Sequence, residues 1–130
     1  MRLLLDTCAF LWAVREPATL SPLAADLISR RDNDLVVSAL VPWELAIKYR
    51  SGRLPEAGPV VLDYPGTLAR LGASSWPITH THTLQAGLLP WGHRDPFDRL
   101  LAAVAIMEGL PLVSRDPVFD ELPDVRRIWD

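Results

Sequence analysis

Short, mostly apolar runs alternate with longer amphipathic segments along the chain. The short runs predict buried strands at residues 2–5, 35–38, 76–79, 111–114 and 126–129. The segments between them repeat apolar positions every three or four residues, which predicts helices at residues 7–14, 22–30, 40–50, 65–71, 83–89 and 96–108. Strands that alternate with helices are typical of a parallel sheet covered on both faces. The pattern therefore predicts an α/β fold with a central parallel sheet of about five strands flanked by helices.

Nothing in the sequence divides this pattern into separate parts. The 12 prolines and seven glycines are scattered without forming a linker, and the chain contains no internal repeat. Gly52 and Gly109 follow the predicted helices 40–50 and 96–108, at the position where glycine often ends a helix. A length of 130 residues is usual for one domain. We therefore expect residues 1–130 to form a single domain.

The composition, with 49% hydrophobic and 22% charged residues, is that of an ordinary folded protein and excludes a disordered chain. The single cysteine, Cys8, cannot form an internal disulfide, which fits a reducing cytosol. The apolar stretch 3–14 is interrupted by Asp6 and is shorter than the about 20 residues that cross a membrane. The same aspartate argues against a secretory signal. We expect a cytoplasmic protein with no membrane segment.

Five acidic residues lie where strands and helices are predicted to meet. Asp6 directly follows the first strand, and Asp116 follows the fourth strand by two residues. Glu44 lies in the second turn of helix 40–50, and Asp98 lies in the first turn of helix 96–108, three residues after Asp95. The carboxyl ends of parallel strands share one edge of a sheet, where functional groups gather. We therefore expect Asp6, Glu44, Asp98 and Asp116 to converge on one edge of the sheet.

These acids change the meaning of the formal net charge, which is −3 and by itself argues weakly against a nucleic-acid partner. The five are among 16 acidic residues, so 11 remain against 13 Lys and Arg. Crowded carboxylates repel one another, and few basic residues are placed to compensate them. A divalent cation, Mg²⁺ or Mn²⁺, is the natural partner of oxygen ligands, whereas Cys8 and the three histidines form no zinc-binding pattern. With a bound cation, a polyanionic substrate is electrostatically permitted.

Each acid also has a structural interpretation. Asp6 is suited to capping the helix that begins at residue 7, and Asp116 is suited to a turn or cap. Glu44 is placed to pair with Lys48 four residues later, although it lies on the apolar stripe of its helix. Asp95 directly precedes a proline, which is typical of a helix N-cap. Individually these signals are weak, and the joint placement of the acids is the stronger evidence.

Four segments in this order and spacing resemble those of PIN-domain proteins, and more narrowly the VapC toxins of bacterial VapBC toxin–antitoxin pairs: LLLDTCAFLW, SALVPWELAIK, HRDPFDRLLAAVA and LVSRD. The resemblance implies a five-stranded parallel sheet and Mg²⁺- or Mn²⁺-dependent endoribonuclease activity. It assigns the family's four acids to Asp6, Glu44, Asp98 and Asp116, all of which are present. It also implies a VapB-type antitoxin as partner, a homodimer, and RNA as the substrate.

The chemistry expected of these acids is phosphodiester hydrolysis. A divalent cation lowers the pKa of bound water and draws in phosphate oxygens. We expect Asp6, Asp98 and Asp116 to hold the metal, directly or through water, and Glu44 to orient or deprotonate the attacking water. The resemblance implies products with a 5′-phosphate and a 3′-hydroxyl. The number of ions, one or two, and a contribution of Asp95 to the metal site stay open.

Three arginines flank the acids and are candidates for contacts to phosphate groups, namely Arg94, Arg99 and Arg115. Two other classes of protein also place acids at the edge of a parallel sheet. A non-catalytic receiver-like signalling domain expects an acidic pair after the first strand, but Asp6 is followed by Thr7. A phosphatase of the haloacid type expects a second aspartate two residues after the first, where Cys8 stands. Both alternatives fit these residues less well than the nuclease.

Overall fold

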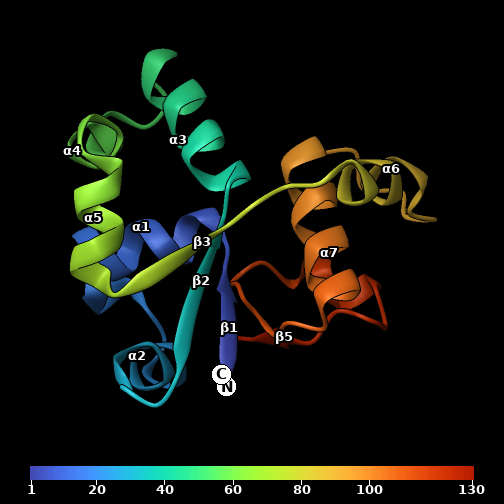
Figure 1. Ribbon diagram of the computed structural model, residues 1–130, viewed down its shortest axis with the longest axis horizontal. Helices are drawn as coiled ribbons and strands as arrows, with labels where there is room; N and C mark the ends of the chain where they lie inside the picture. The colour runs from blue at the N-terminus through green and yellow to red at the C-terminus, as the bar shows by residue number, and fades with distance from the viewer.

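A sheet of five parallel strands forms the centre of the computed structural model, which describes residues 1–130 (Figure 1). The strands are β1 (Arg2–Leu5), β2 (Asp34–Ser38), β3 (Ala73–Trp76), β4 (Leu112–Val113) and β5 (Arg127–Ile128). Their order in the sheet is β3-β2-β1-β4-β5, and every neighbouring pair is parallel. The predicted α/β architecture with a five-stranded parallel sheet is confirmed.

Seven α-helices cover the sheet. They are α1 (Thr7–Arg15), α2 (Pro22–Ser29), α3 (Leu40–Arg50), α4 (Gly58–Leu62), α5 (Tyr64–Leu71), α6 (His80–Leu88) and α7 (Pro96–Glu108). In Figure 1, α1 and α5 lie to one side of the strands, and α6 and α7 lie to the other. Short 3-10 helices occur at Pro17–Thr19, Pro55–Ala57 and Pro117–Glu121. None of the helices has the length and apolar character that crossing a membrane requires.

The strand order reverses at β1. From β1 the chain builds outward to β2 and β3, and it then returns to place β4 and β5 on the other side. In open α/β sheets, ligands bind in the crevice at the carboxyl ends of the strands where the order reverses. Those strands are β1 and β4, which pair Leu4 with Leu112 and Leu5 with Val113. The residues that follow Leu5 and Val113 therefore lie where this fold is best suited to form a site.

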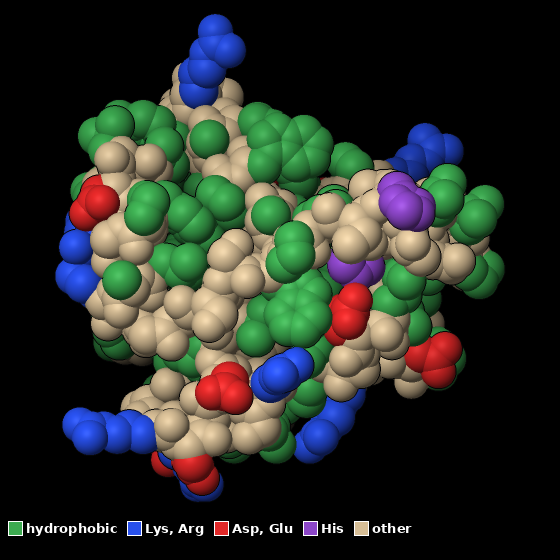
Figure 2. All heavy atoms as spheres, in the orientation of Figure 1, with side chains coloured by type: hydrophobic (Ala, Val, Ile, Leu, Met, Phe, Trp, Pro, Cys, Tyr) green, Lys and Arg blue, Asp and Glu red, His purple; other side chains and the backbone are tan.

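Strand β1 and helix α7 supply much of the buried core. Leu3–Leu5 are completely buried, and burial of each leucine stabilises the fold by about 1.5–3 kcal/mol. Ala102 and Ala105 of α7 are buried and follow Asp98 by four and seven residues, so the three share one face of the helix. These small side chains let α7 pack closely, which brings Asp98 toward the strand ends. On the face that Figure 2 shows, hydrophobic side chains fill much of the middle and most Lys and Arg lie at the margin.

The third strand differs from its prediction at residues 76–79, because β3 covers Ala73–Trp76. As an edge strand paired only with β2, it is half-buried or exposed, so no apolar run marks it. Pro77, which has no amide hydrogen to donate, ends it. Thr79 already caps α6, which begins at His80 rather than at residue 83 because Thr79 and His82 form a reciprocal capping box.

Smaller differences concern the ends of elements and the shortest helices. Strands β4 and β5 cover only two residues each, inside the predicted ranges 111–114 and 126–129. Helix α4 was not predicted, because five residues are too few to show a helical repeat. Gly109 ends α7 as predicted, with the left-handed φ of +63° that glycine adopts readily. Helix α3 ends at Arg50 as predicted, but its C-cap is Ser51 rather than Gly52.

Candidate active site

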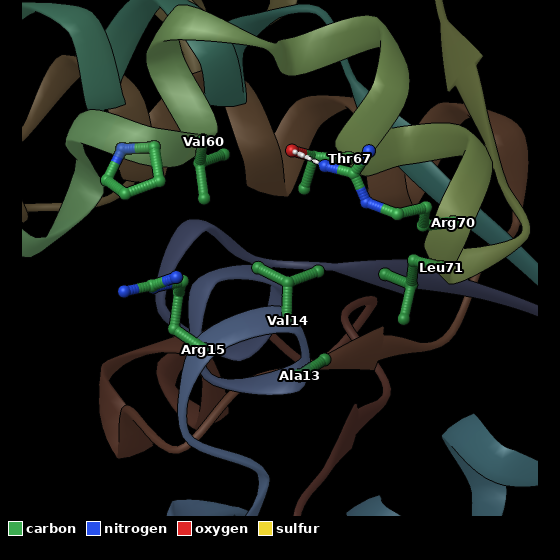
Figure 3. A pocket seen from close by; sticks show the side chains of 8 residues that line it. Ala13, Val14, Arg15, Val60, Thr67, Arg70 and Leu71 are labelled. Carbon is green, nitrogen blue, oxygen red and sulfur yellow. Dashed lines mark hydrogen bonds between the residues drawn. The ribbon is translucent and has the colours of Figure 1, made fainter.

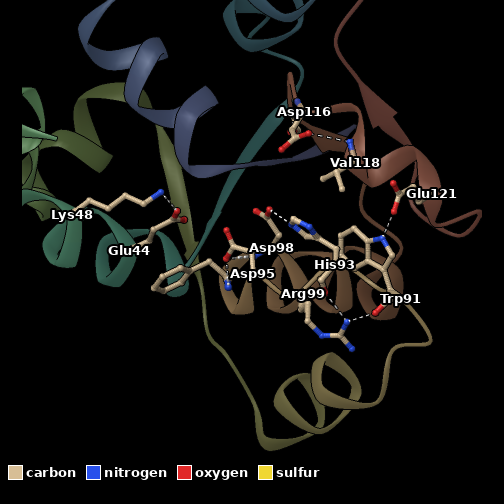
Figure 4. A network of polar contacts seen from close by, with 12 residues as sticks. Glu44, Lys48, Trp91, His93, Asp95, Asp98, Arg99, Asp116, Val118 and Glu121 are labelled. Atoms are coloured by element: carbon tan, nitrogen blue, oxygen red, sulfur yellow. Dashed lines mark hydrogen bonds and ion pairs between the residues drawn. The ribbon is translucent and has the colours of Figure 1, made fainter. Parts of the chain in front are cut away.

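The four predicted acids line one cavity of about 400 Å³ at the carboxyl ends of β1 and β4. Glu44 and Asp98 lie in helices, whereas Asp6 and Asp116 lie in the segments that follow β1 and β4. Figure 4 shows the carboxylates of Glu44, Asp98 and Asp116 with the polar contacts around them. The cavity is also lined by Thr7, Cys8, Trp12, Lys48, Asp95, Leu101, Arg115, Pro117 and Phe119. The expected convergence of Asp6, Glu44, Asp98 and Asp116 is therefore present in the structure.

Asp6 joins β1 to α1 and caps the helix, because its Oδ1 accepts a hydrogen bond from the amide of Ala9 at 2.7 Å. Burial raises the pKa of the Asp6 carboxyl to about 6, and the negative charges of Asp98 and Glu44 add to this increase. Hydrogen bonds from the Ser114 hydroxyl and the Ala9 amide oppose it. No basic side chain contacts Asp6, so no positive charge in contact with the carboxylate balances its negative charge.

Glu44 is buried in α3 and its carboxylate is held at both oxygens. The Thr7 hydroxyl donates to Oε1 at 2.5 Å, and the Lys48 ammonium donates to Oε2 at 2.5 Å. Burial lowers the pKa of Lys48, but the hydrogen bond and charge of Glu44 outweigh it, so the pKa lies above its usual value. The structure thus contains the ion pair between Glu44 and Lys48 that their spacing in the helix suggested. Both residues line the cavity, so the pair does not lie on a solvated face.

Asp98 lies in the first turn of α7, next to His93 and Asp95. The Nε2 of His93 lies 2.7 Å from Oδ2 of Asp98. Asp95 caps α7 as predicted, and its Oδ1 accepts from the amide of Phe97 at 2.9 Å. Burial and the negative charge of Asp95 raise the pKa of Asp98, with burial as the larger cause. The hydrogen bond from His93 lowers it, but the pKa still lies above its usual value. One potential ligand atom from each of His93, Asp95 and Asp98 lies within 4.8 Å of the others.

Asp116 follows β4 and is the one exposed member of the four acids. Its Oδ1 accepts from the amide of Val118 at 3.0 Å and caps the helix Pro117–Glu121. Its own amide donates to the hydroxyl of Ser114 at 3.1 Å. Ser114 is completely buried, and its hydroxyl also acts on Asp6 by opposing the increase in the pKa of that carboxyl.

Two of the four acids contact a basic side chain. Lys48 pairs with Glu44, and the imidazole of His93 contacts Asp98. His93 was not predicted as part of the site. It lies in a loop and Asp98 lies in a helix, so their separation in the sequence does not show that their side chains meet. Its only signal was its place in the segment HRDPFD, five residues before Asp98.

The three candidate arginines have different surroundings. The guanidinium of Arg99 donates to backbone carbonyls between Ala86 and His93, so it is committed to holding this segment. Arg115 lines the acidic cavity, and its guanidinium lies 5.9 Å from the ring centroid of Trp12, without a carboxylate partner. Arg94 is exposed and does not line the cavity. Only Arg115 therefore combines a position at the cavity with an unpaired charge.

A second cavity, of about 360 Å³, lies between α1 and the segment formed by α4 and α5 (Figure 3). It is lined by Val14, Val60 and Leu71 together with Arg15 and Arg70, and no acidic side chain lines it. The guanidinium of Arg70 donates to the hydroxyl of Thr67. Since this cavity lacks carboxylates, the cavity at β1 and β4 is the candidate for metal-dependent chemistry.

Comparison with known proteins identifies the family of the chain and agrees with the fold. The family model of the PIN domain matches residues 3–125, and the chain belongs to the PIN domain family. Ribonuclease VapC16 of Mycobacterium tuberculosis is 39% identical over 51 residues, which are 39% of this chain and 36% of that protein. The chain thus matches only about a third of the length of this relative. Membership of the PIN family disfavours the receiver-like alternative.

Two crystal structures share the fold across nearly the whole chain. One is VapBC2 from Rickettsia felis bound to a DNA fragment from its promoter, with a TM-score of 0.72, 21% identity and complete coverage of both chains. The other is VapC20 of Mycobacterium tuberculosis, a toxin that cleaves the sarcin-ricin loop, with a TM-score of 0.62 and 19% identity. This match covers 95% of the present chain and 98% of VapC20. At these identities the similarity establishes the fold.

Proposed function

We propose that this protein is a divalent-metal-dependent endoribonuclease and the toxic component of a toxin–antitoxin pair. The observation that carries the proposal is the convergence of Asp6, Glu44, Asp98 and Asp116 on one cavity where the strand order reverses. The PIN family membership and the VapC relatives support this class of activity. The single cysteine and an RNA substrate both fit a cytoplasmic enzyme.

The residues of the cavity fit a bound Mg²⁺ or Mn²⁺. The available donor atoms are carboxylate oxygens, which both ions prefer, and Asp6 has no cationic partner of its own. Asp6, Asp98 and Asp116 would hold the ion, directly or through water. When bound, the cation would acidify a water molecule and neutralise charge on the phosphate group.

Glu44 would orient the attacking water and accept its proton. Its carboxylate is fixed by Thr7 and Lys48, and each oxygen keeps a further lone pair for a hydrogen bond from water. Attack of this water on phosphorus breaks the bond to the 3′ oxygen, which takes up a proton. The products would then carry a 5′-phosphate and a 3′-hydroxyl.

Arg115 would bind a phosphate group of the RNA. Its guanidinium lies against Trp12 at the cavity, and a planar guanidinium is suited to two hydrogen bonds with phosphate oxygens. Lys48, the other basic residue of the cavity, is engaged by Glu44. Arg115 is therefore the basic group available to an anionic substrate.

A nuclease of this kind requires a means of inhibition in the cell. We propose a VapB-type antitoxin as its protein partner and a homodimer as its assembly. The resemblance of the four sequence segments to VapC toxins and the similarity to VapC16 support both.

The purified protein should cleave RNA in the presence of Mg²⁺ or Mn²⁺, and EDTA should stop the reaction. Gel analysis of an end-labelled RNA, followed by enzymatic typing of the product ends, tests both the metal requirement and the bond that breaks. Undiminished cleavage in EDTA, or products with 3′-phosphates, would contradict the mechanism. Formation of a phosphoprotein with acetyl phosphate would instead favour the receiver-like alternative.

A further inference from the structure

His93 contacts Asp98, one of the proposed metal ligands. It lies in the segment between α6 and α7, and its Nε2 is 2.7 Å from Oδ2 of Asp98. Asp98 lines the acidic cavity, whereas His93 does not. In Figure 4, the imidazole of His93 and the carboxylate of Glu44 lie on opposite sides of the Asp98 carboxylate.

The backbone that carries His93 is held by Arg99. Its guanidinium donates to the carbonyls of Leu89 at 2.8 Å, Trp91 at 2.7 Å and His93 at 3.0 Å. It also donates to the carbonyl of Ala86 at 2.9 Å, near the end of α6. Because Arg99 directly follows Asp98 in α7, the helix that presents the carboxylate also fixes the segment that presents the imidazole.

The imidazole ring is held as well as its backbone. The ring of Trp91 packs against that of His93 with a centroid distance of 4.9 Å, and it also packs against Phe119. The indole N–H of Trp91 donates to Glu121 at 2.8 Å. The ring of His93 therefore has little freedom to leave Asp98.

We propose that His93 is a positioning residue that holds Asp98 through Oδ2 and leaves Oδ1 to bind the divalent cation. This inference rests on the proposed function. A metal-binding carboxylate that is free to rotate loses conformational freedom when the ion binds, whereas one that is already fixed by a hydrogen bond loses less. Loss of such an outer partner typically reduces metal affinity by about 10- to 100-fold.

A different role for His93 would be to stabilise the start of α7 without affecting the metal. The two roles differ in what a variant changes. A structural contact affects the stability of the metal-free protein, whereas a positioning contact affects the metal affinity and depends on a hydrogen-bond donor at the place of Nε2. The side-chain amide of glutamine places an N–H at nearly the same distance from the backbone as Nε2 of histidine. Leucine is similar in size to histidine but has no hydrogen-bond donor.

The test is titration of the purified full-length protein with Mn²⁺ in a calorimeter, with melting of the metal-free variants measured in parallel. His93→Leu should raise the Kd for Mn²⁺ by about 10- to 100-fold, and His93→Gln should stay within a few-fold of the unaltered protein. His80→Leu is the control, because His80 is an exposed histidine that does not line the cavity. In RNA cleavage, the His93→Leu variant should need more Mn²⁺ but recover most of its rate at saturation.

An unchanged Kd in His93→Leu would overturn the inference while leaving the proposed function intact. A His93→Gln variant that melts like the unaltered protein but binds Mn²⁺ as weakly as His93→Leu would also overturn it. If the unaltered protein neither binds Mn²⁺ nor cleaves RNA, the proposed function itself fails.

Discussion

Replacing Asp6 by asparagine should make the metal-free protein more stable while it abolishes cleavage. Burial raises the pKa of Asp6 from 3.8 to about 6, so the ionised carboxylate is less favourable in the folded protein than in the unfolded chain. A difference of this size corresponds to about 3 kcal/mol at neutral pH, which is an upper value. Asparagine removes the charge but keeps a side-chain oxygen that can accept the hydrogen bond from the Ala9 amide. The helix cap should therefore survive, since Asn and Asp cap helices about equally well.

The stability gained by Asp6→Asn should increase with pH. Because the pKa of folded Asp6 lies above its unfolded value, the penalty is absent below about pH 4 and grows as the pH rises through about 6. At pH 7.5 in EDTA, we expect Asp6→Asn to be more stable by about 1–3 kcal/mol, and at pH 5 by about half as much.

Urea denaturation followed by circular dichroism measures this difference directly. Asp116→Asn is the matched control, because Asp116 also caps a helix through its carboxylate but is exposed, and it should change the stability little. Adding Mg²⁺ should stabilise the unaltered protein and not Asp6→Asn. A loss of stability in Asp6→Asn at pH 7.5, or a gain that does not shrink at pH 5, would show that the ionised carboxylate of Asp6 does not destabilise the folded protein.

Two further pairs of variants separate neighbouring residues with different roles. Asp98→Ala should reduce metal-dependent cleavage by orders of magnitude, whereas Asp95→Ala should cost about 1 kcal/mol in thermal melting, as for a lost helix cap, and keep most activity. An inactive, stable Asp95→Ala variant would move the metal ligand to that residue. Arg115→Gln should weaken RNA binding measured in EDTA and lower its salt dependence by about one released ion, whereas Arg94→Gln should change neither. Equal effects of the two arginine variants would argue against a specific phosphate contact.

The sheet and the placement of the acids were predictable because they depend on features that the sequence carries locally. The apolar runs at β1 and β2 mark buried strands, and Asp6 and Asp116 follow strands that the fold must place side by side. The edge strand β3 was displaced from its prediction because an exposed strand needs no apolar run. Its true limits are set by Pro77 and by the capping of α6 at Thr79.

The surroundings of the acids could not be predicted, because they depend on contacts between distant elements. Sequence alone presented the cap at Asp6 and a metal ligand at Asp6 as alternatives, and likewise for Asp116. The structure shows that a cap occupies one carboxylate oxygen in each case, which leaves the other available. The contact of His93 with Asp98 depends on the path of the segment before α7, whose carbonyls accept hydrogen bonds from Arg99.

If the acidic cavity is the site of RNA hydrolysis, loss of two of its carboxylates should abolish the activity. We would measure the rate of RNA cleavage in Mn²⁺ by the double variant Asp6→Asn/Asp98→Asn, purified side by side with the unaltered protein. Both substitutions keep the size of the side chain, and asparagine retains the cap at Asp6. We expect a folded double variant without detectable cleavage under conditions where the unaltered protein degrades the RNA. Equal cleavage by both preparations would contradict it, because the hydrolysis would then arise outside this cavity.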